Sequence, residues 1–182
     1  MKPLPLDGMI TLAEGREAVY FCNSFTRLPN IIDLAWDLKF EDWLTLLGEQ
    51  WEACDNISEC VDALWETPFP ELIKNPLVYR NAMMTAAERS ALSNLPDTVT
   101  IYRGCYAHNK GGLSWTLSRE IAERFPLTHR YHADGQPLLV RAAVNRDRIV
   151  AVKLDRGEEE VIAWMPKIIT ISHIRTRRRN AH

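Results

Sequence analysis

The strongest constraint on the fold is a change in hydrophobic pattern at Leu95-Pro96-Asp97. Before this point apolar residues recur at the spacing of amphipathic helices, and after it they form short runs rich in β-branched residues. Because the helical and strand-like patterns are segregated along the chain, we expect an α+β fold. The front part of the chain, before Leu95, should be helical, and the back part, after Asp97, should be rich in β-strands. The 182 residues suffice for one well-buried domain, or for a domain with a helical annex.

Three stretches of the front part have helical periodicity. Residues 30–52 have the spacing of one long helix or two shorter ones, and residues 57–65 repeat the pattern. Residues 72–92 continue it, with an interruption expected at Pro76. We expect the tryptophans and leucines of these stretches to be core side chains rather than a cofactor site. Residues 1–29 predict no definite element.

The back part carries strand-like runs and one short helix. The helix is predicted over Ser118 to Phe125, because Ser118 can cap its N-terminus, Glu120 lies in its first turn and Pro126 follows its end. The strand-like runs are Val99–Arg103, Leu138–Asn145, Arg148–Leu154, Glu160–Met165 and Ile168–Ile174.

Charge and cysteine usage narrow the class of protein. A net charge of −2 gives no global argument for a nucleic-acid or membrane partner, and no apolar run approaches the roughly 20 residues of a membrane-spanning helix. The N-terminus lacks a signal-peptide pattern, and the cysteines have no framework spacing. We therefore expect a cytoplasmic protein with reduced thiols. The basic residues near the C-terminus are expected to form a solvated tail.

Arg103 is the first candidate functional residue. Strand alternation places it on the same face as Val99 and Ile101, two β-branched apolar residues. Burying a guanidinium on a core-facing side costs desolvation free energy unless an anion pairs with it. The sequence therefore predicts an anion beside Arg103, supplied by the protein or by a ligand.

The second candidate is the acidic run Glu158-Glu159-Glu160. Three consecutive acids usually form a solvated loop, but this run leads directly into an apolar strand. Strand alternation would send Glu158 and Glu160 to one face and Glu159 to the other. Glu160 lies deepest in the strand and is the better candidate for a desolvated functional carboxylate.

The third candidate is Ser114-Trp115-Thr116, which follows a loop containing two glycines. Alternation places Ser114 and Thr116 on one face and Trp115 on the other. The two hydroxyls either serve a site or bond the neighbouring backbone, and both interpretations stay open.

Taken in chain order, these three features resemble the Arg/Ser/Glu signature of the mono-ADP-ribosyltransferases. The Glu-x-Glu spacing of Glu158 and Glu160 resembles that of the arginine-modifying group, and the passage from LPDTVTIYRG into GLSWTLSREIAERF is similar to ADP-ribosyltransferase-like proteins of bacteria and their phages. The resemblance covers residues 95–175. It implies an NAD-binding catalytic core with a split β-sheet over residues 95–176, between a helical region (1–94) and a basic tail (177–182), or one compact domain comprising all three.

The resemblance implies catalytic roles for three residues. Glu160 would bond the ribose 2′-hydroxyl of NAD and stabilise the oxocarbenium-like ribosyl centre. Glu158 would orient or deprotonate the acceptor. Ser114 would hydrogen-bond Glu160 and set its orientation.

The resemblance also implies the residues that bind NAD as substrate. Arg103 would hold a phosphate or ribose, and the backbone at Gly104 would bond the nicotinamide amide. The remaining expected NAD-binding residues are Ser114, Trp115, Thr116 and Phe125. Two departures, Trp115-Thr116 after the first serine and a short loop before Glu158, put the substrate and acceptor in question.

The implied reaction is cleavage of the nicotinamide–ribose bond of NAD and transfer of ADP-ribose. The chain would then be a transferase of the glycosyltransferase class. Its expected role is that of a toxin or effector. The expected acceptor is a host or bacterial protein, with arginine as the candidate side chain, and the arginine-rich C-terminus leaves a nucleic-acid acceptor open. Two alternatives remain: an NAD glycohydrolase, and an inactive scaffold that binds a partner.

A zinc site is the competing interpretation of the histidines. Cys105 and His108 form one pair with metal-ligand spacing, and His129 and His132 form another. Both pairs fall in expected loops, and we expect no metal.

Overall fold

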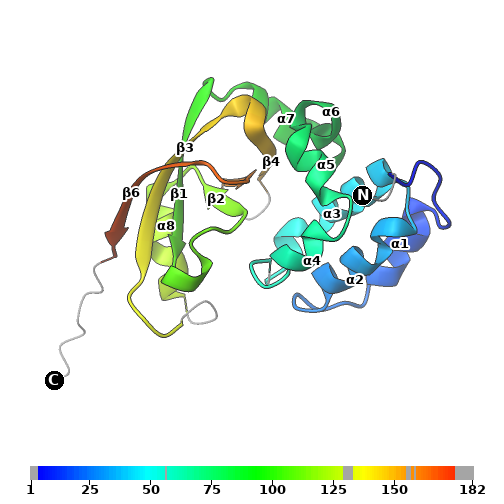
Figure 1. Ribbon diagram of the computed structural model, residues 1–182, viewed down its shortest axis with the longest axis horizontal. Helices are drawn as coiled ribbons and strands as arrows, with labels where there is room; N and C mark the ends of the chain where they lie inside the picture. Colours follow the sequence, from blue (N-terminus) through cyan, green and yellow to red (C-terminus); the bar gives the residue numbers. More distant parts are fainter. Residues whose placement is uncertain (1–3, 56, 129–132, 155–156, 158, 175–182) are drawn as a thin grey trace.

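The computed structural model describes residues 4–55, 57–128, 133–154, 157 and 159–174 (Figure 1). The described chain has the expected α+β organisation. Figure 1 shows helices α1 to α7 gathered at one end of the molecule and the sheet with helix α8 at the other, with α7 and β4 where they meet. No helix within the described ranges is both long and apolar enough to cross a membrane.

The helical part consists of short helices joined by tight turns. The stretch 30–52 forms two helices, and the stretch 72–92 is interrupted before Pro76, as predicted, and again at a 3-10 turn. The helices are α1 (Leu12–Val19), α2 (Arg27–Asp33), α3 (Phe40–Gln50), α4 (Val61–Trp65), α5 (Phe69–Lys74), α6 (Pro76–Tyr79) and α7 (Ala86–Ser93).

The sheet has six strands, all paired antiparallel, in the order β4-β5-β2-β1-β3-β6. Strands β1 and β3 pair along their whole length, from Thr98 opposite Asn145 to Cys105 opposite Leu138. Between β1 and β2 the register contains one pair, Tyr102 opposite Thr116. The strands are β1 (Thr98–Cys105), β2 (Ser114–Thr116), β3 (Leu138–Asn145), β4 (Ile149–Lys153), β5 (Glu160–Ala163) and β6 (Lys167–His173).

The single β1–β2 pair divides the sheet into two three-stranded halves, β4-β5-β2 and β1-β3-β6. Helix α8 (Arg119–Arg124) covers the second half, where Ala122 packs with Leu139 and Ile174. The apolar face of β1 that carries Val99 and Ile101 belongs to a larger cluster that also contains residues of the helical part. One continuous core therefore includes side chains from both parts of the chain.

Glycine at position 104 is required by the packing of α8 on β1. A Cβ at Gly104 would lie 1.8 Å from the carbonyl oxygen of Ala122 and 2.6 Å from Pro126 Cδ. Both distances are far below van der Waals contact, so the two backbones approach closely only because no side chain separates them.

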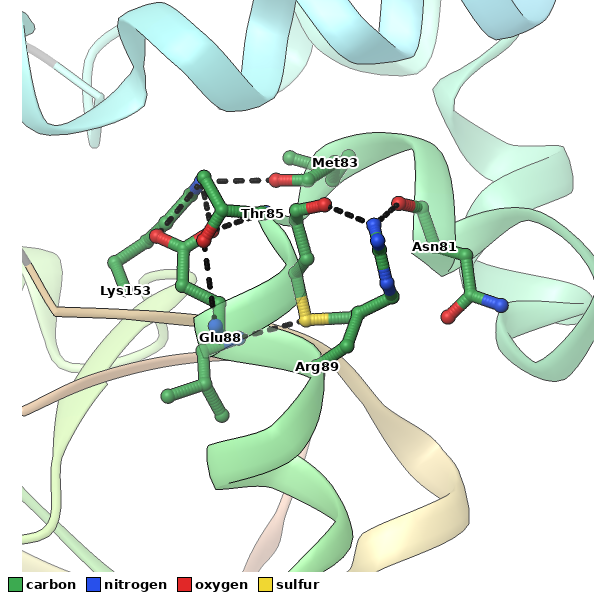
Figure 2. A network of polar contacts seen from close by, with 8 residues as sticks. Asn81, Met83, Thr85, Glu88, Arg89 and Lys153 are labelled. Carbon is green, nitrogen blue, oxygen red and sulfur yellow. Dashed lines mark hydrogen bonds and ion pairs between the residues drawn. The ribbon is translucent and has the colours of Figure 1, made fainter.

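A buried polar network joins the helical part to the edge strand β4 (Figure 2). Lys153 of β4 donates from Nζ to the carbonyl oxygen of Met83, at 2.8 Å, and forms an ion pair with Glu88 of α7, at 3.3 Å. Glu88 also accepts from the backbone N–H of Thr85, at 2.7 Å, which caps α7. The network fixes the start of α7 against the sheet.

Candidate functional site

A cavity of about 630 Å³ lies between the helical part and the junction of β1 and β2. This volume is in the range of sites that bind small molecules and cofactors. Glu158 lies outside the described residues, so its prediction has no structural counterpart here. The other residues singled out from the sequence all line this one cavity: Arg103, Gly104, Ser114, Trp115, Thr116, Phe125 and Glu160.

Arg103 lies on β1 with a half-buried side chain, and backbone carbonyl groups hold its guanidinium. Its Nε and Nη2 donate to the carbonyl oxygen of Asn109, at 3.2 and 3.1 Å, and its Nη1 donates to that of Ser114. A guanidinium has five N–H donors, so these bonds leave two without a protein acceptor among the described residues. The group is both fixed in place and able to bind an anion.

Groups of the protein partly compensate the positive charge of Arg103. Burial lowers the pKa of the guanidinium, and Cys105, when ionised, and Glu160 oppose this shift. The guanidinium remains a cation because an arginine pKa starts far above neutrality. Among the described residues Arg103 has no ion pair: carbonyl oxygens supply its direct hydrogen bonds, and Glu160 lines the same cavity.

Gly112 makes room for this guanidinium. A Cβ at position 112 would lie 2.3 Å from Nη2 and 2.6 Å from Cζ of Arg103. The neighbouring Gly111 has open space at the same point. Of the two loop glycines, Gly112 is the one that the position of Arg103 requires.

Glu160 begins β5 and lies opposite Thr116 of β2 and Lys153 of β4. Residues directly opposite on antiparallel strands project to the same face, so Glu160 and Thr116 share a face of the sheet. The side chain is only 9% exposed, and Oε1 accepts a hydrogen bond of 3.0 Å from the indole Nε1 of Trp51. The prediction that Glu160 is the desolvated carboxylate of the acidic run agrees with this burial.

The extended strand conformation expected at Glu159 is wrong, and the expectation for Glu158 lies outside the described residues. Strand β5 starts at Glu160, and Glu159 has φ 47°, in the left-handed region that non-glycine residues seldom adopt. The side chain of Glu159 is exposed, and its carbonyl oxygen accepts from the N–H of Leu117, at 3.1 Å. A turn rather than a strand therefore leads into Glu160.

The two hydroxyls of β2 differ in their bonding. Thr116 Oγ1 accepts from the N–H of Ser118 at 3.1 Å, which is the local backbone role weighed from the sequence. Ser114 Oγ is buried, and within the described part of the chain it has no hydrogen-bond partner. The expected bond from Ser114 to Glu160 is absent from these described contacts, and Trp51 donates to Glu160 instead.

Two of the other expected NAD-binding residues, Gly104 and Trp115, have a structural role of their own. Gly104 is needed for the packing of α8, so its missing side chain gives no separate support for a ligand contact. Trp115 is buried, and its Nε1 donates to the carbonyl oxygen of Gly112 at 3.1 Å. Phe125 follows α8 and contributes part of the cavity wall.

The sequence analysis missed the contribution of the helical part to the cavity. Trp51 and four acidic side chains line it from that side. A buried tryptophan needs a hydrogen-bond acceptor, which is a signal for Trp51, but the identity of the acceptor requires the tertiary fold. We name the four acidic residues the acidic wall: Glu52, Asp55, Glu59 and Asp62.

Cys105 and His108 also line the cavity. Burial raises the pKa of the Cys105 thiol, although Arg103 and Lys110 oppose the shift, so at neutral pH the thiol is protonated. The second pair of the zinc interpretation, His129 and His132, lies outside the described residues. Within the described ranges no group of three or more histidine, cysteine and acidic side chains is placed to hold a metal ion.

Neither the protein-family models, nor the curated protein sequences, nor the solved structures with which the chain was compared give a match.

Proposed function

We propose that the chain is a mono-ADP-ribosyltransferase that cleaves NAD and transfers ADP-ribose to a protein acceptor. The observation that carries the proposal is the convergence of Arg103, Ser114 and Glu160 on one cavity of about 630 Å³. The three residues come from three separate strands, in the chain order of the Arg/Ser/Glu signature. Their meeting at one cavity supports a common site.

The sheet supports the same proposal for the fold. Its two halves are joined by the single pair of Tyr102 and Thr116, so the sheet is weakly connected where the cavity lies. This arrangement agrees with the split β-sheet of an ADP-ribosyltransferase-like core. Clefts lined by apolar side chains with a few convergent polar groups are the usual ligand sites.

In the proposed reaction the bond between the nicotinamide nitrogen and ribose C1′ breaks, and its electron pair leaves with nicotinamide. Positive charge develops at C1′, and a buried carboxylate such as Glu160 stabilises this charge. A nucleophilic acceptor atom then forms a bond to C1′ and loses a proton. Two N–H groups of Arg103 remain for an oxygen of the substrate's phosphates.

The acidic wall, Glu52, Asp55, Glu59 and Asp62, supports a cationic acceptor. It faces the same cavity as Glu160, and negative charge there favours a positively charged side chain over an acidic one. A protein arginine fits this requirement. This is also the acceptor that the Glu-x-Glu spacing suggests.

The test is incubation of the protein with adenylate-labelled NAD, in bacterial lysate and in buffer, with nicotinamide release measured in both. Release with a labelled macromolecular band that is lost in the Glu160→Gln variant is the expected result. Release without a band identifies an NAD glycohydrolase instead. No release in either setting overturns both, and favours a scaffold that binds a partner.

A further inference from the structure

We infer that Trp51 of the helical part positions the carboxylate of Glu160, so that the helical part completes the catalytic site. The inference rests on the proposed function for its kinetic consequence. Trp51 is a positioning residue in this account, because it acts on the substrate through Glu160.

The contact is a hydrogen bond between two buried side chains from the two parts of the chain. Nε1 of Trp51 donates to Oε1 of Glu160 at 3.0 Å, and the two residues are 109 positions apart. Trp51 is fully buried, in the 3-10 turn that continues α3. Both ring and carboxylate are thus held by their surroundings, and the bond sets the direction of one carboxylate oxygen.

Other buried tryptophans show that this choice of acceptor is specific. Trp43, which lies on α3 and is equally buried, donates to the carbonyl oxygen of Ile31 at 2.8 Å. Trp115 donates to the carbonyl oxygen of Gly112. A backbone carbonyl is therefore sufficient to satisfy an indole in this core, whereas Trp51 donates to a side-chain carboxyl group that lines the cavity.

Neither Lys153 nor Ser114 bonds Glu160 among the described contacts. Lys153 lies opposite Glu160 in the register, but its ammonium group bonds Met83 and Glu88. Ser114 Oγ has no hydrogen-bond partner among the described residues. Trp51 makes a hydrogen bond to Glu160 of the kind that the family resemblance implies for the hydroxyl of Ser114.

The first test observes the contact without any assay of activity. The chain contains six tryptophans, so the indole N–H resonances of the full-length protein form a small set that single Trp→Phe variants can assign. In Glu160→Gln we expect the Trp51 resonance to move, because a neutral amide is a weaker acceptor, while that of Trp43 stays in place. An unmoved Trp51 resonance overturns the inference.

The second test uses Trp51→Phe with Trp43→Phe as the matched control. Both substitutions remove one buried indole N–H from the same helical region, but only the first removes a donor to Glu160. We expect Trp51→Phe to lower kcat for nicotinamide release about 10- to 100-fold with KM for NAD little changed, since misplacing a reacting group has effects of this order. Trp43→Phe is expected to keep kcat within about twofold once melting curves confirm folding.

An equal fall of kcat in both variants overturns the positioning role, since it reports only lost packing. A rise of KM with unchanged kcat in Trp51→Phe overturns it as well, because it indicates a role in binding. If the parent protein releases no nicotinamide, the proposed function fails, and the indole resonance in Glu160→Gln alone decides whether Trp51 holds this carboxylate.

Discussion

The buried pair of Glu88 and Lys153 allows a quantitative prediction about how the helical part is attached to the sheet. Both side chains are only 4% exposed, and Lys153 has one further acceptor, the carbonyl oxygen of Met83 (Figure 2). Glu88→Gln keeps the shape of the side chain and an oxygen that can cap α7. It removes the negative charge and leaves the ammonium group buried without its counter-ion.

Removing one partner of a buried ion pair costs about 3–5 kcal/mol, because the remaining charge stays desolvated. For a chain of this size each kcal/mol lowers the melting temperature by about 2–4 °C. Glu88→Gln should therefore lower the melting temperature by about 6–20 °C. The double variant Glu88→Gln with Lys153→Met should recover most of this loss, because no unpaired charge remains.

The assay is thermal and urea unfolding followed by circular dichroism, with Glu123→Gln as the control. Glu123 forms an ion pair with Arg119 at 2.8 Å, but both side chains are exposed, so its loss should cost at most about 1 kcal/mol. If Glu88→Gln is no more destabilising than Glu123→Gln, or if the double variant is the least stable of the series, the reasoning from burial is wrong.

Two further predictions concern the cavity. Gly112→Ala should lower NAD turnover at least about tenfold, because its Cβ would displace the guanidinium of Arg103. Gly111→Ala has open space around its Cβ and should leave the initial rate unchanged. Equal rates in the two variants would contradict this explanation. Because burial raises the pKa of Cys105, its alkylation at pH 7 should be slower than that of a free thiol and should accelerate as the pH rises. Because the Cys105 pKa is higher in the folded protein, the unfolded thiol ionises first, and the free energy of unfolding should fall in alkaline solution. Rapid alkylation of Cys105 in the folded protein at pH 7 would contradict the raised pKa.

Much of the sheet could be predicted from the sequence because its signals are local. Strand β3 begins and ends at the expected residues, and Ser118 caps α8 by accepting from the N–H of Ile121 at 3.3 Å. Helix α1 was missed among scattered prolines and glycines, although Thr11 and Glu14 form a capping box at its start.

The candidate site could be predicted only in part, because half of it depends on contacts distant in the sequence. Alternation placed Arg103 on the correct face of β1, but the carbonyl oxygens that hold it come from Asn109 and Ser114. Alternation failed before β5, because Glu159 turns the chain. The bond from Trp51 to Glu160 crosses from the helical part to the sheet, and no local pattern predicts it.

The most direct test of the proposed function is the initial rate of nicotinamide release by Glu160→Gln, with Glu159→Gln as the control. The two residues are adjacent, but Glu160 is 9% exposed and lines the cavity, whereas Glu159 is exposed. Removing one preorganised electrostatic group costs about 10²–10³ in rate. We predict a loss of at least about 10² for Glu160→Gln and a rate close to that of the parent for Glu159→Gln. Near-parental turnover by Glu160→Gln would contradict the account.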